Sequence, residues 1–273
     1  MEKKPWDVQL LRSASRAAPS SLAIDTLHRA LSTIQKNPNE PKYRRIDLSS
    51  PGFKRALSST PGTLDFLTHG VGFSPSPSSK NIYTLSFVDA ARMFAALSAL
   101  EEIRLRSYEY NLDRSRRVFL KTLLALRSST GDAAKDAAEE ARRAELLRLV
   151  PLDPATMSAT LITVSLGGGG DAEKLSRKFA ADDTLGDVLN WLGGHLGGEA
   201  MGKVAGGEFV LLNRSKHPKD VVQAHDEKRV GELKGKTLQY LDLWPSAELE
   251  LASAEVHGMV LGEKKWRAEH EAP

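Results

Sequence analysis

Apolar residues follow a helical spacing near the start of the chain. From Ile24 to Ile34 they recur at gaps of three, four and three, which places them on one face of an amphipathic helix. This helix is expected to end at Asn37-Pro38, because the residue before a proline avoids the helical conformation. The apolar positions of the predicted helix are Leu22, Ile24, Leu27, Leu31 and Ile34.

Shorter elements follow this helix. In "SSPGFKRAL", Ser50 suits the N-cap of a helix and Pro51 its first position. "PGTLDFLTHGVGF" predicts a second short helix that ends at Gly70 and Gly72. "IYTLSF" alternates like a strand or an extended segment.

A run without glycine or proline extends from Phe87 to Arg127 and predicts one long helix or two joined helices. After "SSTGD", a segment rich in Ala, Glu and Arg predicts another helix, most of it solvated. We expect this helix to fold back on its predecessor as an αα-hairpin within a helical linker, residues 104–157. The long run carries one stripe of Phe87, Ala91, Phe94, Leu97, Leu100 and Ile103, and a second of Leu105, Tyr108, Leu112, Phe119, Leu123 and Leu126.

The pattern changes after Pro154. Strand-like segments at 158–166 and 174–180 precede an apolar helix at 182–196, for which Asp182 or Asp183 is the expected N-cap. A third strand-like segment at 206–214, a short helix or turn at 236–243 and a last strand at 247–252 complete the order. The order β-β-α-β and a final β predicts a ubiquitin-like roll. The chain is therefore expected to be α+β, with a charged tail at 253–273.

Composition narrows the class of protein. Hydrophobic residues make up 41% of the chain and cysteine is absent, so thiol nucleophiles, thiolate metal sites and disulfides are excluded. No run approaches the ~20 apolar residues of a membrane span. The first residues, through position 19, lack the apolar region of a signal peptide, and we expect them to be flexible. These features predict a soluble protein of the cytoplasm or nucleus.

The net charge of +3 is divided unevenly. Residues 1–130 carry 20 Lys and Arg against 11 Asp and Glu, a net charge of +9, whereas residues 131–273 carry 18 against 24, a net charge of −6. A basic first half favours acidic partners, either nucleic acid or acidic peptide.

Motifs of catalysis are missing from the sequence. "GGGGD" lacks the Gly-Lys-Ser/Thr of a phosphate-binding loop and reads as a hairpin turn, and no GxSxG elbow occurs. The histidines have neither HxxxH nor HExxH spacing, and no pair of carboxylates is set apart as acid and base. We therefore expect no enzyme activity, no metal site, no catalytic residues and no cofactor.

The segment from Thr33 to Leu48, "TIQKNPNEPKYRRIDL", carries the most distinctive pattern. It places Tyr43 among three cations directly after a rigid turn. Such a cluster suits a solvated helix start, a nucleic-acid contact or a pocket for an acidic peptide.

Together with "LSSPGFKRAL" and "TLDFLTHGVGF", this segment resembles the PUB domain, a small helical domain of peptide N-glycanases and related proteins. The resemblance covers about residues 20–103 and implies an all-α domain. It also implies that this domain binds the acidic, aromatic C-terminal tail of a hexameric AAA+ unfoldase, the valosin-containing protein. The partner-binding residues it implies are Thr33, Lys36, Asn37, Lys42, Tyr43, Arg44, Ile46, Gly72 and Phe73.

Two positions depart from the PUB pattern. Thr33 stands where the family often has asparagine, and Asp47 stands where it often has a cation. Losing a charge-assisted hydrogen bond of ~1.5–3 kcal/mol at Thr33 would weaken tail binding by roughly one to two orders of magnitude. Asp47 would repel an acidic tail, and Arg45 or Lys36 would have to compensate.

Residues 158–252 are similar to a UBX domain, a ubiquitin-like β-grasp roll that many unfoldase adaptors carry. The family binds through Phe-Pro-Arg in one loop, and the aligned residues here are His217, Pro218 and Lys219. Histidine fills an apolar pocket poorly, and lysine cannot make the planar, bidentate contact of arginine. The resemblance therefore implies an altered unfoldase site in this roll.

The combination of both domains resembles non-enzymatic adaptors of the unfoldase in ubiquitin-dependent protein handling. One alternative is a nucleic-acid-binding protein that uses the basic first half of the chain, although few aromatic residues are present for base stacking. A second is a protein of this kind that has lost unfoldase binding. A PUB-containing N-glycanase is disfavoured because the chain has no cysteine nucleophile.

Overall fold

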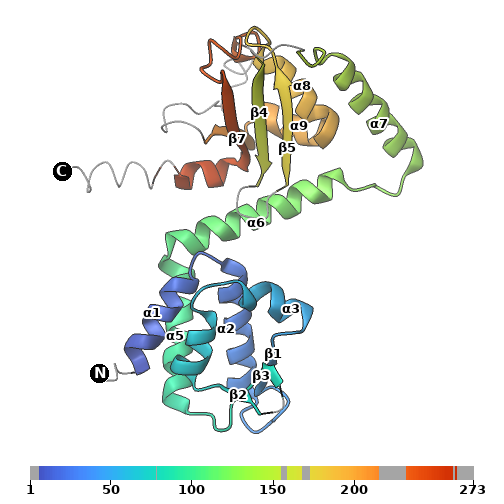
Figure 1. Cartoon of the computed structure of the whole chain (residues 1–273). Helices are drawn as coiled ribbons and strands as arrows, with labels where there is room; N and C mark the ends of the chain where they lie inside the picture. The colour runs from blue at the N-terminus through green and yellow to red at the C-terminus, as the bar shows by residue number, and fades with distance from the viewer. Residues whose placement is uncertain are drawn as a thin grey trace, which may run out of the picture. The chain divides into compact units, whose positions relative to one another are not determined.

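The computed structural model describes residues 6–77, 79–154, 159–167, 173–214, 232–260 and 262 (Figure 1). The chain forms two compact units, Met1–Arg114, here called the helical unit, and Ser115–Pro273, the sheet unit. The elements are α1 (Trp6–Ala17), α2 (Ser21–Lys36), β1 (Arg45–Asp47), α3 (Pro51–Phe53), the π-helix η1 (Lys54–Ser58), α4 (Thr63–Asp65), the π-helix η2 (Phe66–Val71), β2 (Ser74–Ser76), β3 (Ser79–Thr84), α5 (Ala90–Arg106), α6 (Tyr108–Arg127), α7 (Ala133–Arg148), β4 (Thr160–Leu166), β5 (Lys174–Phe179), α8 (Leu185–Leu196), α9 (Gly198–Ala205), β6 (Phe209–Asn213) and β7 (Ser246–Ser253).

Helix α2 forms the centre of the helical unit. The hydroxyl of Ser20 accepts a hydrogen bond from the backbone N–H of Ala23 and so caps the first turn. The predicted apolar face is buried at Ile24, Leu27 and Leu31, and α2 packs against α5. A second face of α2, beside the buried one, lines the cavity described below.

The prediction of a flexible segment at residues 1–19 is wrong for the part that the structure describes, which is helical from Trp6 to Ala17. Trp6–Ala17 forms α1 and buries Leu10, Ala14 and Ala17 in the same core as α2. These three residues lie four and three positions apart, so they share one helical face. Leu10 packs against Gly70, where a larger residue would collide with it.

The helical unit is not all-α, because it includes a small antiparallel sheet of order β1-β3-β2. In this sheet Ile46 pairs with Tyr83. Successive side chains of a strand point to opposite faces, so Ile46 enters the core while Arg45 stays exposed. The strand thus places an apolar floor and a cation next to each other.

The long helical run breaks at Ser107, so it is two joined helices. Ser107 ends α5 with an extended backbone, and its hydroxyl accepts a hydrogen bond from the N–H of Tyr110 at 3.3 Å, as an N-cap does. The first predicted stripe of this run is confirmed at its end, where Leu97, Leu100 and Ile103 are in or packed against the core. It is wrong at its start, since Phe87 and Phe94 are 75% and 69% exposed. The side chains of α5 that are buried are Met93, Ala96, Ala99 and Leu100. Two alanines in this set let α5 lie close to α1 and α2.

The sheet unit is built on a four-stranded mixed sheet of order β5-β4-β7-β6 (Figure 1). The two central strands, β4 and β7, are parallel, and both outer strands run antiparallel to their neighbours. Helix α8 covers one face of the sheet, and its side chains Leu185, Val188 and Trp191 enter the core with Ile162. Thr184, rather than an aspartate, is the N-cap, and it forms a capping box with Asp187.

Helices α6 and α7 do not form the predicted αα-hairpin, and residues 115–150 are part of the sheet unit instead of a linker. Phe119 and Leu123 of α6 enter the core of the sheet unit. There the ring of Phe119 packs edge-to-face on the ring of Phe209, with 4.8 Å between the ring centres. Helix α7 packs against α8. Gly193 and Gly194 have no side chains to hold α7 away, and a Cβ on either would collide with a leucine of α7.

The C-terminal end of the described chain also differs from the expected tail. Residues 254–260 are helical after β7, and Val256 is buried. Residues 263–273 lie outside the described residues. In the part of the chain that the structure describes, no helix is long and apolar enough to cross a membrane.

Candidate functional site: a basic groove on the outer face of α2

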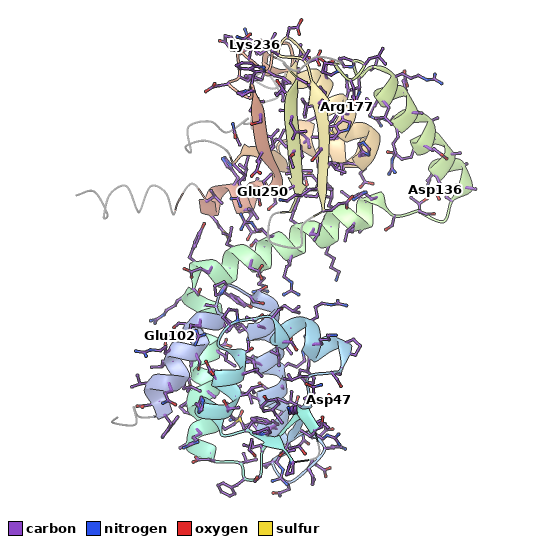
Figure 2. The ribbon with its side chains drawn as sticks, in the orientation of Figure 1. Asp47, Glu102, Asp136, Arg177, Lys236 and Glu250 are labelled. Carbon is purple, nitrogen blue, oxygen red and sulfur yellow. The ribbon has the colours of Figure 1, made fainter. Side chains whose placement is uncertain are left out.

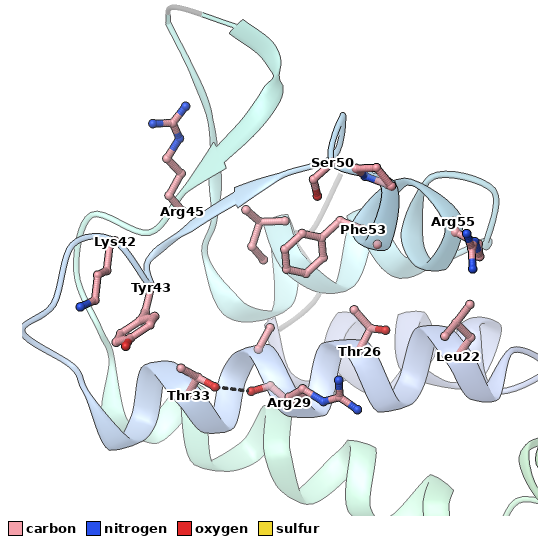
Figure 3. Close-up of a pocket in the computed structure, with 14 residues that line it drawn as sticks. Leu22, Thr26, Arg29, Thr33, Lys42, Tyr43, Arg45, Ser50, Phe53 and Arg55 are labelled. Atoms are coloured by element: carbon pink, nitrogen blue, oxygen red, sulfur yellow. Dashed lines mark hydrogen bonds between the residues drawn. The ribbon is translucent and has the colours of Figure 1, made fainter.

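A groove of about 630 Å³ lies in the helical unit, between α2 on one side and the segment from Lys42 to Arg55 on the other (Figure 3). Lys42 and Tyr43 lie at one end of the groove in Figure 3, and Leu22 and Arg55 lie at the other. We call this site the groove.

One wall of the groove is a face of α2. Leu22, Thr26, Arg29, Ala30 and Thr33 line it, and their spacing of three and four places them beside the buried face of the same helix. Only Thr33 of these residues was predicted from the sequence. The helical period contained the signal, since positions 22, 26, 29 and 33 form a stripe next to the core positions.

The other wall follows from the way α2 ends. Asn37 is the C-cap, and its backbone N–H bonds to the carbonyls of Thr33 and Ile34 while its side chain donates to the Thr33 carbonyl at 3.0 Å. The turn after it returns the chain along α2, where Lys42, Tyr43, Arg45 and Ile46 line the groove, as do Ser50, Pro51, Gly52, Phe53 and Arg55 of the next segment.

The groove is basic and partly apolar. Its lining includes the four cations Arg29, Lys42, Arg45 and Arg55, and no aspartate or glutamate. The ammonium of Lys42 lies 4.8 Å from the centre of the Tyr43 ring, and its nearest carboxylate is Glu40 at 3.7 Å. This arrangement suits a ligand that combines apolar or aromatic groups with negative charge.

Ile46 and Phe53 give the groove its apolar character. Ile46 is 1% exposed and belongs to the core, so only an edge of its side chain borders the groove, whereas Phe53 is partly buried. Tyr43 is 37% exposed, and a large part of its ring is therefore available to a ligand.

The structure gives each of the two departures from the PUB pattern a local role. The Thr33 hydroxyl donates to the Arg29 carbonyl at 2.8 Å, the dashed line in Figure 3, so that its oxygen remains as an acceptor. Asp47 does not line the groove and accepts hydrogen bonds from the N–H and hydroxyl of Ser49 at 2.9 and 2.5 Å. The hydroxyl of Ser49 lowers the pKa of Asp47.

Five of the predicted partner-binding residues do not line the groove. Arg44 donates from Nη1 to the Ser86 carbonyl at 3.0 Å and so ties the turn to the segment after β3. Phe73 is 3% exposed in the core, and Gly72 ends η2 at φ +100°, a conformation that favours glycine. Asn37 caps α2, and Lys36 lies beside another cavity. Their observed contacts therefore place these five residues in the fold or beside another cavity and not in the lining of the groove.

The predicted loop of the second domain, His217, Pro218 and Lys219, lies outside the described residues. Among the residues that the structure does describe, no group of three or more His, Asp or Glu is placed to hold a metal ion.

Comparison with known proteins gives a family match and a similar curated protein. Residues 17–93 match the family model of the PUB domain, and every residue that lines the groove lies in this range. UBX domain-containing protein 6 of Homo sapiens is 32% identical over 141 residues, a match that covers 46% of this chain and 31% of the human protein. The chain therefore spans about a third of the length of the curated relative it matches.

Proposed function

Since the protein carries a PUB domain at residues 17–93, we propose that it is a non-enzymatic adaptor of a hexameric AAA+ unfoldase of the valosin-containing type. In this role the groove binds the acidic, aromatic C-terminal tail of the unfoldase, in ubiquitin-dependent protein handling. The observation that carries the proposal is the groove itself, which combines four cations and no carboxylate with the exposed ring of Tyr43.

Charge supports the choice of an acidic peptide. Residues 1–87 carry 12 Lys and Arg against 6 Asp and Glu, a net charge of +6. A field of this sign speeds the encounter with an acidic tail. Within the groove, the guanidinium groups of Arg29, Arg45 and Arg55 can each pair with a carboxylate in bidentate geometry. The Asp47 carboxylate is bonded to Ser49 and lines no part of the groove, so it opposes this ligand little.

For the sheet unit we propose a ubiquitin-like roll of the UBX type. The parallel pairing of β4 and β7 at the centre of the sheet, with α8 on one face, supports this assignment, and so does the name of the human relative. The substitutions His217 and Lys219 favour a roll that adds little to unfoldase binding. The adaptor would then depend on the groove.

A binding experiment with one variant and one matched control tests the groove. We expect Tyr43→Ala to weaken binding of the unfoldase tail peptide about tenfold, because the ring supplies an exposed apolar face beside the cations. Tyr240 of the sheet unit is the control, since it is 70% exposed and the Lys236 ammonium lies 4.9 Å from the centre of its ring. Isothermal calorimetry with the full chain measures both.

Tyr240→Ala should bind the peptide as wild type does. Both variants should keep the wild-type melting temperature within a few degrees, because each removed ring is substantially exposed. Undetectable binding by the wild type at high micromolar peptide would contradict the proposal. Equal loss in both variants would show that tyrosine in the groove has no special part in binding.

A further inference from the structure

A second cavity of the helical unit, about 460 Å³ in volume, lies between α2 and the junction of α5 and α6. We call it the basin. Its lining comes from α2, α5 and α6, and consists of Asp25, His28, Arg29, Ser32, Thr33, Lys36, Arg104 and Arg114. Arg29 and Thr33 also line the groove, so the basin and the groove adjoin across α2.

The acidic groups at the basin already have cationic partners. Asp25 lies 3.5 Å from Nε of Arg104 and accepts a hydrogen bond from the Tyr110 hydroxyl at 2.8 Å. Glu101 accepts from Nη1 of Arg104 at 2.8 Å and lies 3.3 Å from Nε2 of His28. The pairs hold Arg104 in place and neutralise much of the negative charge nearby.

The other cations of the basin form no such ion pairs with carboxylates in the described part of the chain. Within the described part of the chain, no carboxylate lies within ion-pair distance of Arg29, Lys36 or Arg114. The hydroxyl of Ser32 adds a neutral donor next to them. A group with several acceptor oxygens and more than one negative charge matches these donors better than a single carboxylate does.

We propose that the basin binds the phosphate group of a phosphorylated serine in a partner peptide. A phosphoserine carries about −1.5 to −2 charge at neutral pH and three acceptor oxygens, which suits three unpaired cations. The basin also shares Arg29 and Thr33 with the groove, so a peptide bound in the basin would extend next to the groove along α2. The inference goes beyond the proposed function and does not depend on it, because a peptide without aromatic or acidic residues can test the phosphate site alone.

The test is an NMR titration of the full chain with a short alanine peptide that carries one phosphoserine. We expect the backbone amides of Ser32, Thr33 and Lys36 to shift, and the peptide with unmodified serine to leave them unchanged. Replacing both free cations outside the groove, Lys36→Gln with Arg114→Gln, should weaken binding about tenfold.

The matched control removes the same charge elsewhere. Arg12 and Lys54 are exposed cations of the helical unit that line neither cavity, so Arg12→Gln with Lys54→Gln should bind the phosphopeptide as wild type does. Unchanged melting temperatures in both double variants would show that the fold is kept.

Three outcomes would overturn the inference. One is the absence of amide shifts at millimolar phosphopeptide, and another is an equal loss in the two double variants, which would indicate general attraction to a basic surface. Inorganic phosphate that binds as tightly as the phosphopeptide would assign the basin to a free anion and not to a peptide. Each of these results leaves the calorimetric test of the groove unaffected, because the tail peptide and the Tyr43→Ala variant are measured separately.

Discussion

Glu250→Ala is expected to lower the free energy of unfolding of the sheet unit by about 3–5 kcal/mol. Glu250 lies on β7 and is fully buried (Figure 2). Arg116 of α6 donates from Nε and Nη2 to its two carboxylate oxygens at 3.0 and 3.2 Å, and Nε of Arg214 lies 3.1 Å from Oε2. The side chain of Arg116 is itself only 14% exposed, so alanine at position 250 leaves it charged and poorly solvated.

The loss should shrink when Arg116 is removed as well. In a double-mutant cycle, the variant with both Glu250→Ala and Arg116→Ala should be more stable than Glu250→Ala alone, because the unpaired buried guanidinium is the main source of the penalty. Native-state hydrogen exchange of the amides of β4 and β7 measures the stability of this unit alone. Glu199→Gln, at an exposed position of α9, is the control and should change stability by less than about 0.5 kcal/mol. Additive effects of Glu250→Ala and Arg116→Ala would contradict the coupling.

Leu10→Ala is expected to lower the stability of the helical unit by about 2–5 kcal/mol. The Leu10 side chain is 1% exposed and fills the space above Gly70, so its removal leaves a cavity under α1. Leu11 is adjacent in sequence but 54% exposed, and Leu11→Ala should have little effect.

Hydrogen exchange at the amides of α2 and α5 gives the stability of the helical unit in both variants. The comparison decides whether α1 is part of this unit. Similar, small effects of Leu10→Ala and Leu11→Ala would mean that α1 does not contribute to the core and would restore the flexible N-terminus.

The sequence alone was sufficient to predict those helices and strands in which the apolar residues follow a clear pattern. The core face of α2 and the strands β4, β5, β6 and β7 were predicted near their observed positions. Buried residues follow the helical period in α2, alternate along β4 and form a continuous run in β6. Helix α1 was missed because two of its three core residues, Ala14 and Ala17, are small and give a weak apolar signal.

Long-range packing decided the elements that were predicted wrongly. Phe119 and Leu123 form an apolar stripe that does not by itself specify the surface it packs on. In the structure this stripe packs in the core of the sheet unit. Helix α7 has no buried residue, so its own sequence does not indicate which helix it packs against. The partner is determined by Gly193 and Gly194 on α8, far away in the sequence.

The candidate site was predicted in part. The Lys42-Tyr43 pair and Ile46 were recognised from their motif, and they do line the groove. The motif residues Arg44 and Phe73 do not line the groove, because Arg44 bonds to the Ser86 carbonyl and Phe73 is buried in the core. A motif shows which residues occur together, and it does not show which of them share a surface. The face of α2 that carries Arg29 completes the groove, and a reading of the helical period beyond the core face would have found it.

The central claim is that the groove binds the C-terminal tail of the unfoldase. Its most direct test is the affinity of the full chain for the intact hexamer, compared with the same hexamer lacking only its C-terminal tail. The proposed role of the groove predicts clear binding to the intact hexamer and loss of most of it when the tail is removed. Equal binding to both hexamers would contradict the claim, and so would the absence of binding to the intact hexamer.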